Sequence, residues 1–280
     1  MSLSLVGEEL EVECASGLLV RNSLIVEQVI ETNVVIIGAI GRPNGHIDVK
    51  PSTLAWLRRQ YDQGALLVSI CTGAFVLAAT GLLDGKKATT HWACENEFKA
   101  LYPKVKLHIS DMFTEDSFLY CSAGASAYQD MSLRLVSKFF GDDIARLCSK
   151  AVLFDQDRSG QQRYSSFTPK REHKDELIHS IQNWLDDNFT KRFQITVLSE
   201  KACMSERQFK RRFKSATGEA PLSYIQALRI NFAKHKLETT DLHVNLISQA
   251  CSYEDVRFFR QLFKRFTGLS PIEYRRKFSL

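Results

Sequence analysis

No stretch of the sequence is apolar enough to cross a membrane. A membrane-spanning helix needs roughly 18 consecutive apolar residues, whereas the longest apolar run here, VVIIGAI, covers only Val34 to Ile40. The first residues, MSLSLVGEELEVE, are acidic and lack the basic and apolar parts of a secretory signal. These absences exclude an integral membrane protein and predict a cytoplasmic protein with no membrane partner.

The sequence also lacks paired cysteines. Its seven cysteines are widely separated and include no CxxC motif. A disulfide framework or a zinc site needs cysteines in close, regular pairs. The pattern therefore predicts reduced thiols, no bound metal and no cofactor. The seven are Cys14, Cys71, Cys94, Cys121, Cys148, Cys203 and Cys251.

Charge is distributed unevenly along the 280 residues. The net charge is +5, but residues 1–154 carry 14 Lys and Arg against 17 Asp and Glu, a net of −3. Residues 155–280 hold the other 23 basic and 15 acidic residues, a net of +8, and residues 201–280 alone reach +9, with 16 against 7. This length suggests about two domains, and the basic block predicts a polyanionic partner for the second one. A solvated surface that serves only solubility would give the same charge.

The first half alternates strand-like and helical patterns. Residues Val34–Ile37 and Leu66–Ile70 are continuous apolar runs, typical of parallel strands buried on both faces. Residues 104–110 and 117–122 are further strand candidates, and residues 129–140 have helical periodicity. Strands that alternate with helices predict an α/β fold with an open sheet and right-handed crossovers.

The second half has only helical patterns. Before them, residues 155–174 are polar and almost free of aliphatic side chains, as linkers are. We therefore predict an α/β domain at 1–154, a linker at 155–174 and an all-α domain at 175–280. Six helices are expected in that last domain, at 176–189, 196–202, 205–216, 222–237, 244–250 and 255–266.

Two segments of the helical half repeat each other at an offset of fifty residues. RQFKRRFKSATGEAPLSY at 207–224 matches RFFRQLFKRFTGLSPIEY at 257–274 at eight of eighteen positions. Two copies are too few for a solenoid, so the match indicates a duplicated supersecondary unit. The identical pairs are Arg207/Arg257, Phe209/Phe259, Phe213/Phe263, Lys214/Lys264, Thr217/Thr267, Gly218/Gly268, Pro221/Pro271 and Tyr224/Tyr274.

Each copy has an apolar and a basic helical face. Phe209 and Phe213 lie four residues apart on one face, as Phe259 and Phe263 do in the second copy. A short helical stretch precedes each copy, which gives the helix-turn-helix pattern. The opposite faces carry, at i, i+3, i+4 and i+7, the side chains of Arg207, Lys210, Arg211 and Lys214 in the first copy, and of Arg257, Arg260, Gln261 and Lys264 in the second.

These faces have the chemistry that reads duplex DNA. A helix fits the major groove, where Arg or Lys donates to guanine, Gln reads adenine and other basic side chains neutralise phosphate. Two such helices about 34 Å apart would enter successive major grooves. We therefore predict that the eight side chains bind double-stranded DNA. The rival interpretation is a helical bundle whose basic side chains are only solvated.

Residues 175–280 resemble the DNA-binding domain of the AraC/XylS family of bacterial transcription regulators. The motifs that carry the likeness are LSEKACMSERQFKRRFK, RINFAKHKL and FFRQLFKRFTGLSPIEYRRKF. The resemblance implies a double helix-turn-helix domain that binds operator DNA. One departure is Ser252 in CSYED, where the family usually has a glycine. A serine adopts the left-handed conformation only at a cost, which leaves the tilt of the second helix open.

One cysteine stands out in the α/β half. LLVSICTGAF places Cys71 between an apolar strand and a helix, where a sharp turn presents a side chain at the carboxyl edge of a sheet. The helix dipole is expected to lower the pKa of this thiol, and His91 in ATTHW is a candidate neighbour. Three roles are open for Cys71: a buried structural residue, a ligand pocket shared with Thr72 and His91, or a nucleophile.

Residues 10–150 resemble the class I glutamine amidotransferase-like superfamily, in its ThiJ/PfpI branch. CTGAFVLAATGLLDGKKATTHW and CSAGASAYQDMSLRLV are most similar to the sensor domain of GlxA-type AraC regulators, which implies a flavodoxin-like sheet. Hydrolytic relatives usually carry a histidine after the nucleophile, where this chain has Thr72. The family's first strand and helix, which bring an acidic residue to the cysteine, are expected to be missing. Both departures argue against turnover, so we expect no catalytic residue.

Three functions are consistent with the sequence. The first is a sequence-specific transcription regulator with a small-molecule effector, such as a nitrogenous metabolite, which by its resemblance is a homodimer. The second is a cysteine-dependent hydrolase or deglycase that carries a DNA-targeting domain. The third is an architectural nucleic-acid binder, against which the base-facing side chains of both helices argue.

Overall fold

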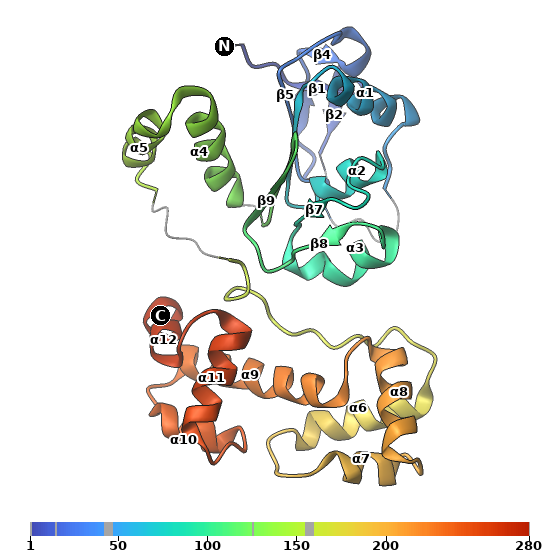
Figure 1. The fold of residues 1–280 in the computed structure, drawn as a ribbon, viewed down its shortest axis with the longest axis vertical. Coiled ribbons are helices and arrows are strands. Elements are labelled where there is room, and N and C mark those ends of the chain that lie inside the picture. Colours follow the sequence, from blue (N-terminus) through green and yellow to red (C-terminus); the bar gives the residue numbers. More distant parts are fainter. Residues whose placement is uncertain (1, 15, 42–46, 125, 155–159, 280) are drawn as a thin grey trace. The chain divides into compact units, whose positions relative to one another are not determined.

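The computed structural model describes residues 2–14, 16–41, 47–124, 126–154 and 160–279. The chain divides into two compact units, which are described separately: unit 1 is residues 1–161 and unit 2 is residues 162–280. Figure 1 labels the elements of each unit. The division falls inside the stretch predicted as a linker, and the predicted domain limits stay predictions.

A four-stranded sheet forms the centre of unit 1. In spatial order it consists of β5 (Val34–Ile37), β6 (Leu66–Ile70), β10 (Leu119–Ser122) and β9 (Phe113–Asp116). Strands β5, β6 and β10 are parallel, while β9 is antiparallel to β10. The predicted α/β fold is confirmed. Strand β9 was not expected, because the acidic residues in its sequence FTED interrupt the apolar pattern.

One predicted strand is mostly wrong. Of residues 104–110, only Lys106–Leu107 form a strand, β8, and Val105 makes a single isolated antiparallel bridge with Asp84. The partner of β8 is the equally short β7 (Lys87–Ala88), so the pair lies outside the main sheet. Polar side chains occupy alternate positions of the run, at Lys104, Lys106, His108 and Ser110, which leaves too few apolar side chains for a strand buried on both faces.

Helices cover both faces of the sheet, as Figure 1 shows. The alternation of side chains along β6 accounts for the two layers. Leu67 packs with Phe75 in the core under the first helices, whereas Val68 packs with Met131 of the other layer. The first layer contains α1 (Pro51–Asp62), α2 (Gly73–Ala79) and α3 (Glu95–Leu101), and the second contains α4 (Ala127–Phe140), which is followed by α5 (Asp142–Ala151).

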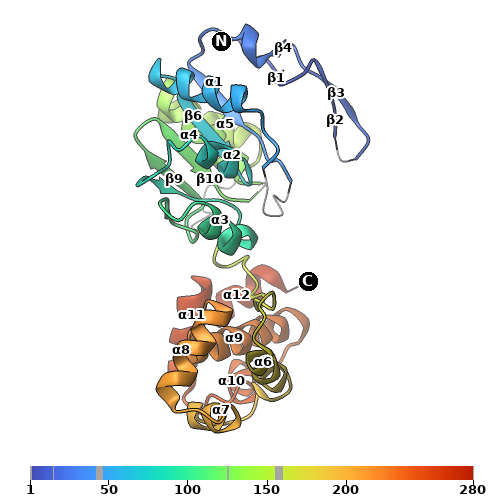
Figure 2. The ribbon, with the colours of Figure 1, turned by 90° about the vertical axis from the view of Figure 1, so that its right-hand side faces the viewer.

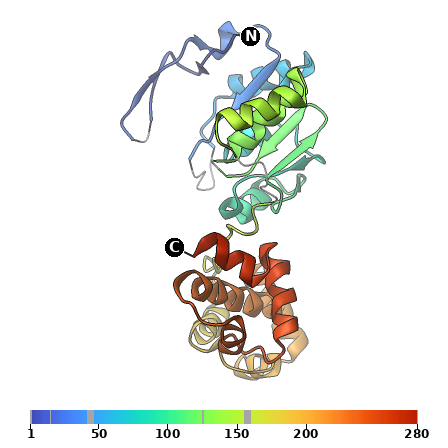
Figure 3. The same cartoon turned by 90° about the vertical axis from the view of Figure 1, so that its left-hand side faces the viewer.

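Short strands precede the main sheet. Figure 2 and Figure 3 show β2 and β3 as a hairpin that extends away from the rest of unit 1. The elements are β1 (Val6–Gly7), which is parallel to β4 (Leu24–Ile25), then β2 (Glu11–Glu13), which is antiparallel to β3 (Leu19–Arg21), and a 3-10 turn at Val26–Gln28. None of these strands joins the four-stranded sheet.

Unit 2 is helical throughout the residues described. The six predicted helices are confirmed, with ends that differ by at most two residues. The structure adds α12, which was not predicted although Ser270 and Glu273 form a capping box at its start. The helices are α6 (Glu176–Asn188), α7 (Ile195–Lys201), α8 (Glu206–Thr217), α9 (Pro221–Thr239), α10 (Val244–Ala250), α11 (Val256–Thr267) and α12 (Pro271–Phe278).

The sequence repeat corresponds to two similar halves of unit 2. In the first half, Phe213 of α8 meets Tyr224 of α9 edge to face, with ring centroids 5.2 Å apart. In the second, Phe263 of α11 meets Tyr274 of α12 in the same way at 5.3 Å. The halves have separate cores. Helix α9 joins them, and its 19 residues span about 28 Å at 1.5 Å per residue.

Gly73 is a position at which unit 1 should tolerate no side chain. A Cβ atom there would lie 2.5 Å from the Ile37 carbonyl oxygen and 2.6 Å from that of Gly38. Because backbone atoms cannot easily give way, we expect Gly73→Ala to lower the free energy of unfolding by about 1–3 kcal/mol. Gly38→Ala is the control, since its Cβ would meet nothing within 4 Å. Urea unfolding of the full chain measures both, and equal stabilities would contradict the prediction.

Lys234 of α9 makes the stability of unit 2 depend on pH. Its side chain is only 7% exposed, and burial lowers its pKa to about 8. Below that pH Lys234 is charged in both states, but its charge is poorly solvated in the folded state and well solvated in the unfolded chain. Stability should therefore rise as the pH increases from about 8 towards the ordinary pKa of 10.5, by at most about 1.4 kcal/mol per pH unit.

The Lys234→Met variant isolates this effect, because it keeps the apolar stem and removes the titrating group. We expect the wild type to gain stability relative to Lys234→Met between pH 7.5 and pH 9.5, values on either side of the pKa of about 8. Urea unfolding of both proteins at the two pH values measures the difference. Parallel pH dependences would show that Lys234 is not the group responsible.

Candidate nucleic-acid interface and sheet-edge site

The N-termini of α8 and α11 are both capped by side chains. Ser205 and Gln208 form a capping box at the start of α8. At the start of α11, the Asp255 carboxylate accepts hydrogen bonds from the backbone N–H groups of Arg257, at 2.8 Å, and Phe258, at 3.1 Å. Such caps define where each helix begins. Arg207 and Arg257 are consequently each the second residue of their helix.

The turn before each of these helices contains a left-handed residue that is not glycine. Cys203 has a φ of 50° and Ser252 a φ of 60°, a conformation that costs roughly 1–2 kcal/mol for residues with a Cβ. The Ser252 hydroxyl donates a hydrogen bond to the Thr190 carbonyl oxygen, which holds the second turn against the α6–α7 connection. Two residues separate Ser252 from the N-cap Asp255, but only one separates Cys203 from Ser205. The second turn is therefore one residue longer.

All eight side chains predicted to bind DNA are exposed on α8 and α11. The phenylalanines of the opposite faces are completely buried, so the basic faces point away from the two cores. Lys210 pairs with Glu206, with Nζ 2.5 Å from the carboxylate. Within the described part of the chain, the other seven side chains have no hydrogen-bond or ion-pair partner. Their donors are available to a ligand.

Two residues of this surface were missed by reasoning from the sequence. Phe258 is 44% exposed in the first turn of α11, and an apolar side chain there can contact thymine methyl groups. The sequence did offer a signal, because Phe258 does not lie on the buried helical face formed by Phe259 and Phe263. Arg212 contacts Asp175, with Nε 2.7 Å from the carboxylate, and holds the pKa of Asp175 below its ordinary value. Since Asp175 caps α6, this pair fixes α8 against α6.

Cys71 lies at the carboxyl end of β6, in the sharp turn that leads into α2. Its φ of 56° is in the left-handed region, as the predicted strand–turn–helix arrangement requires. The Cys71 N–H donates to the Ser122 carbonyl oxygen at 3.0 Å, and the Thr90 hydroxyl donates to the Cys71 carbonyl oxygen at 2.9 Å. Thr72 accepts a hydrogen bond from the Ile40 N–H at 3.1 Å. The turn is thus tied to the chain beyond β5 and to the end of β10.

His91 comes to the same edge of the sheet. A Cβ placed on Gly124, two residues after β10, would lie 3.1 Å from His91 Cδ2, so the imidazole sits against this glycine. His91 Nδ1 accepts a hydrogen bond from the Ala93 N–H at 3.1 Å. In the described chain no hydrogen bond joins His91 to the Cys71 thiol. The structure places Cys71, Thr72 and His91 on one edge without forming a catalytic pair.

The expectation that the helix dipole lowers the pKa of Cys71 is wrong. Burial raises the pKa of this thiol, and hydrogen bonds with Thr72 only partly oppose the effect. Burial also lowers the pKa of His91. A buried thiol loses the water that would solvate its thiolate, which disfavours ionisation. The thiol therefore favours its neutral form, which is a poor nucleophile.

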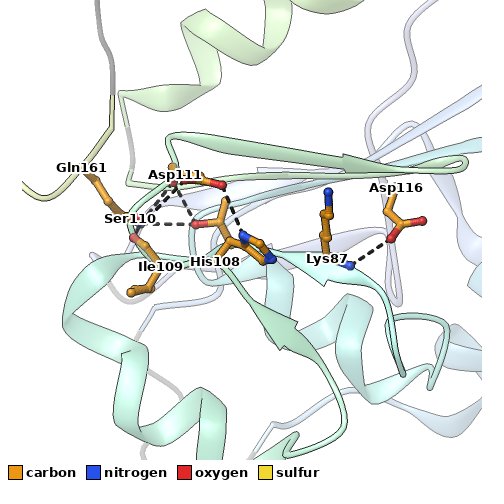
Figure 4. A network of polar contacts seen from close by, with 8 residues as sticks. Lys87, His108, Ile109, Ser110, Asp111, Asp116 and Gln161 are labelled. Atoms are coloured by element: carbon orange, nitrogen blue, oxygen red, sulfur yellow. Dashed lines mark hydrogen bonds and ion pairs between the residues drawn. The ribbon is translucent and has the colours of Figure 1, made fainter.

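A glutamine that was not predicted completes this edge. Figure 4 shows the side chain of Gln161 reaching the backbone of Ile109 and Asp111. Its Nε2 donates to the Ile109 carbonyl oxygen at 2.5 Å and to that of Thr90 at 2.8 Å, while its Oε1 accepts from the Trp92 N–H at 3.0 Å. Gln161 therefore binds the chain on both sides of His91. Its place in a polar stretch far along the sequence gave no signal of this role.

A hollow of about 360 Å³ lies elsewhere in unit 1, between α4, α5 and β9. Phe113, Leu133 and Arg134 are among its lining residues, whereas Cys71, Thr72 and His91 are not. The predicted ligand pocket at those three residues stays a prediction. No cluster of metal-ligating side chains occurs among the described residues, and no helix in these ranges is long and apolar enough to span a bilayer.

Comparison with known proteins finds a matching family in each unit. The DJ-1/PfpI family matches residues 1–138, and a helix-turn-helix domain family matches residues 198–277. The chain is similar to the HTH-type transcriptional regulator CdhR of Pseudomonas aeruginosa, with 29% identity over 229 residues, which are 81% of this chain and 68% of CdhR. It is 25% identical to the HTH-type transcriptional regulator GlxA of Rhizobium meliloti over 95% of this chain and 82% of GlxA.

An enzyme is among the proteins to which part of the chain is similar. Isonitrile hydratase of Pseudomonas putida is 38% identical over 96 residues, which are 34% of this chain and 40% of that enzyme. The likeness is confined to a shorter segment than the matches with the regulators. The predicted combination of a ThiJ/PfpI-type domain with an AraC-type helix-turn-helix domain is confirmed.

Burial of Cys71 predicts low reactivity. At pH 7.5, iodoacetamide should modify the exposed Cys14 and Cys203 well before Cys71, because Cys71 is buried and its pKa is raised. Mass spectrometry of peptides after timed labelling measures the order. Labelling of Cys71 ahead of both exposed thiols would instead indicate a stabilised thiolate and would favour a nucleophile.

Proposed function

We propose that this DNA-binding transcription regulator, with its DJ-1/PfpI domain and AraC-type helix-turn-helix domain, reads successive major grooves of an operator with its two helix-turn-helix units. A small metabolite bound by unit 1 controls this binding. The DNA-binding side chains are Arg207, Lys210, Arg211, Lys214, Arg257, Arg260, Gln261 and Lys264.

The internal repeat is the observation that carries the DNA-binding site. Of its eight identical pairs, six have a role in the fold: four pairs of side chains are buried, and the glycine and proline pairs end one helix and begin the next. The other two, Arg207/Arg257 and Lys214/Lys264, are exposed. Folding does not require these charges, so a shared function in both copies explains them. A polyanion contacted in the same way by both helices is such a function.

The control by a metabolite rests on the sheet edge of unit 1. Open α/β sheets bind ligands beyond the carboxyl ends of their parallel strands, and Cys71, Thr72 and His91 lie there. Ligand control requires an effector that binds one arrangement of the regulator better than another.

A homodimer belongs to this proposal as well. The apolar side chains of Phe140, Ile144 and Leu147 on the α4–α5 pair are exposed, which offers a surface for a second copy.

The alternative is a cysteine-dependent enzyme with a DNA-targeting domain. The similarity to isonitrile hydratase and the sharp turn at Cys71 favour it, whereas the raised pKa of the thiol argues for a non-catalytic role. The Cys71→Ala variant separates the two. A regulator should keep its DNA binding, while a hydrolase should lose all turnover of its substrate.

Selection of bound duplexes from a random DNA pool tests the proposal. With the purified full chain at about 150 mM salt, we expect a motif with two defined blocks whose centres lie about 10 base pairs apart, one helical turn. The spacing follows from two recognition helices on one face of the duplex. Enrichment of no sequence above bulk DNA, with and without cell-extracted metabolites, would contradict the proposal.

Two substitutions distinguish base reading from phosphate binding. Arg257→Ala should weaken binding to the selected duplex by about 1–3 kcal/mol and random duplexes far less, if Arg257 donates to a base. Lys214→Ala should weaken all duplexes about equally and reduce the salt dependence. Lys104→Ala, an exposed lysine in unit 1, is the control. Fluorescence anisotropy measures the affinities, and equal small losses for all three variants would refute these roles.

A further inference from the structure

The second part of the predicted linker is docked on unit 2. We call residues 162–171 the strap. The Lys234 ammonium of α9 donates a hydrogen bond to the Ser165 carbonyl oxygen at 2.6 Å. Three residues earlier on the same helix, the Asn231 amide accepts from the Phe167 N–H at 3.3 Å and donates to the Phe167 carbonyl oxygen at 3.5 Å. These side chains hold the backbone of the strap along α9.

The strap contacts the cores of both helix-turn-helix halves. The Phe167 ring meets Tyr224 edge to face at 5.1 Å and packs on the core of the first half. The Tyr164 ring meets Phe278 at 5.7 Å, and Phe278 packs on the core of the second half. A displacement of the strap would therefore disturb the packing of both halves.

The residue before the strap is fixed in unit 1. Gln161 is only 2% exposed, and its N–H donates to the Ser110 carbonyl oxygen at 2.9 Å, in addition to its side-chain contacts on either side of His91. Thr90, whose carbonyl oxygen it holds, also donates to the Cys71 carbonyl oxygen. Movement of Cys71 or His91 would thus act directly on Gln161.

Only three residues separate Gln161 from Ser165. A flexible linker absorbs motion over many residues, but a connection this short between two anchored points absorbs little. Extended, four residue steps span at most about 14 Å. A shift of the Gln161 anchor relative to α9 must therefore stretch this connection or pull the strap from α9.

We propose that Gln161 and the strap form the coupling element that transmits effector binding at the sheet edge of unit 1 to the two DNA-binding halves. The inference rests on the proposed function and adds its route of regulation. An effector that moves the chain around His91 changes the hydrogen bonds between Gln161 and this chain. The strap then changes its position on α9. Gln161 is a positioning residue in this device, because it acts through the backbone that it holds.

Reciprocity supplies a test that needs no effector. If two conformations of unit 1 give different affinities for DNA, bound DNA must shift the equilibrium between those conformations by the same factor. The reporter is the Trp92 N–H, which bonds to the Gln161 side chain. On addition of the duplex recovered in the selection, hydrogen exchange at Trp92 in the full chain should change by roughly fivefold or more, the low end of measured couplings.

Variants at the far end of the strap test the route. Lys234→Met leaves unit 1 intact, so exchange at Trp92 without DNA should equal that of the wild type, while the response to DNA should disappear. Lys236→Met, the same change on the same helix at a residue that does not hold the strap, should respond like the wild type. Gln161→Ala should raise basal exchange at Trp92 and abolish the response. Anisotropy with the same duplex establishes that each variant binds DNA.

The outcomes separate the coupling from the function on which it rests. If the wild type binds the duplex and exchange at Trp92 does not change, the coupling is overturned and the regulator stands. A response that persists in Lys234→Met likewise overturns the strap as the route. If the wild type binds no duplex, the proposed function fails, and the coupling fails with it.

Discussion

The edge-to-face contact between a helix phenylalanine and the tyrosine of the following helix is the interaction on which the DNA-binding unit depends. Phe213 and Tyr224 make it in the first half, and Phe263 and Tyr274 make it in the second. The buried rings fix the rotation of α8 and α11 about their axes. Once that rotation is fixed, the charged side chains can only face outward. The outward-facing basic surface is thus a consequence of how the cores pack.

At the sheet edge of unit 1, burial makes a side chain less reactive. The turn at Cys71 has the conformation that exposes a nucleophile in hydrolases, but the surrounding chain covers the thiol and raises its pKa. His91 uses Nδ1 on the Ala93 backbone, and burial lowers its pKa as well. The same backbone geometry can therefore serve catalysis or recognition. Desolvation here favours the neutral form of each group.

The strap explains why a polar segment can be ordered without a core of its own. Each of its anchors satisfies backbone groups: Lys234 and Asn231 do so on α9, and Gln161 does so in unit 1. Backbone groups that are covered must be paired, and long polar side chains can pair them from a neighbouring element. This pattern cannot be read from composition, because the residues that hold the segment lie far from it in the sequence.

The sequence by itself determined the elements and the basic faces. Helical periodicity and the repeat located six helices and eight exposed side chains, because an amphipathic helix reports its buried face through local spacing. Continuous apolar runs likewise located strands β5 and β6. The tertiary structure alone decided the state of Cys71, the pairing of β8 with β7, and the roles of Gln161 and Lys234. Solvation and hydrogen-bond partners depend on residues distant in the chain, and local spacing carries no information about them.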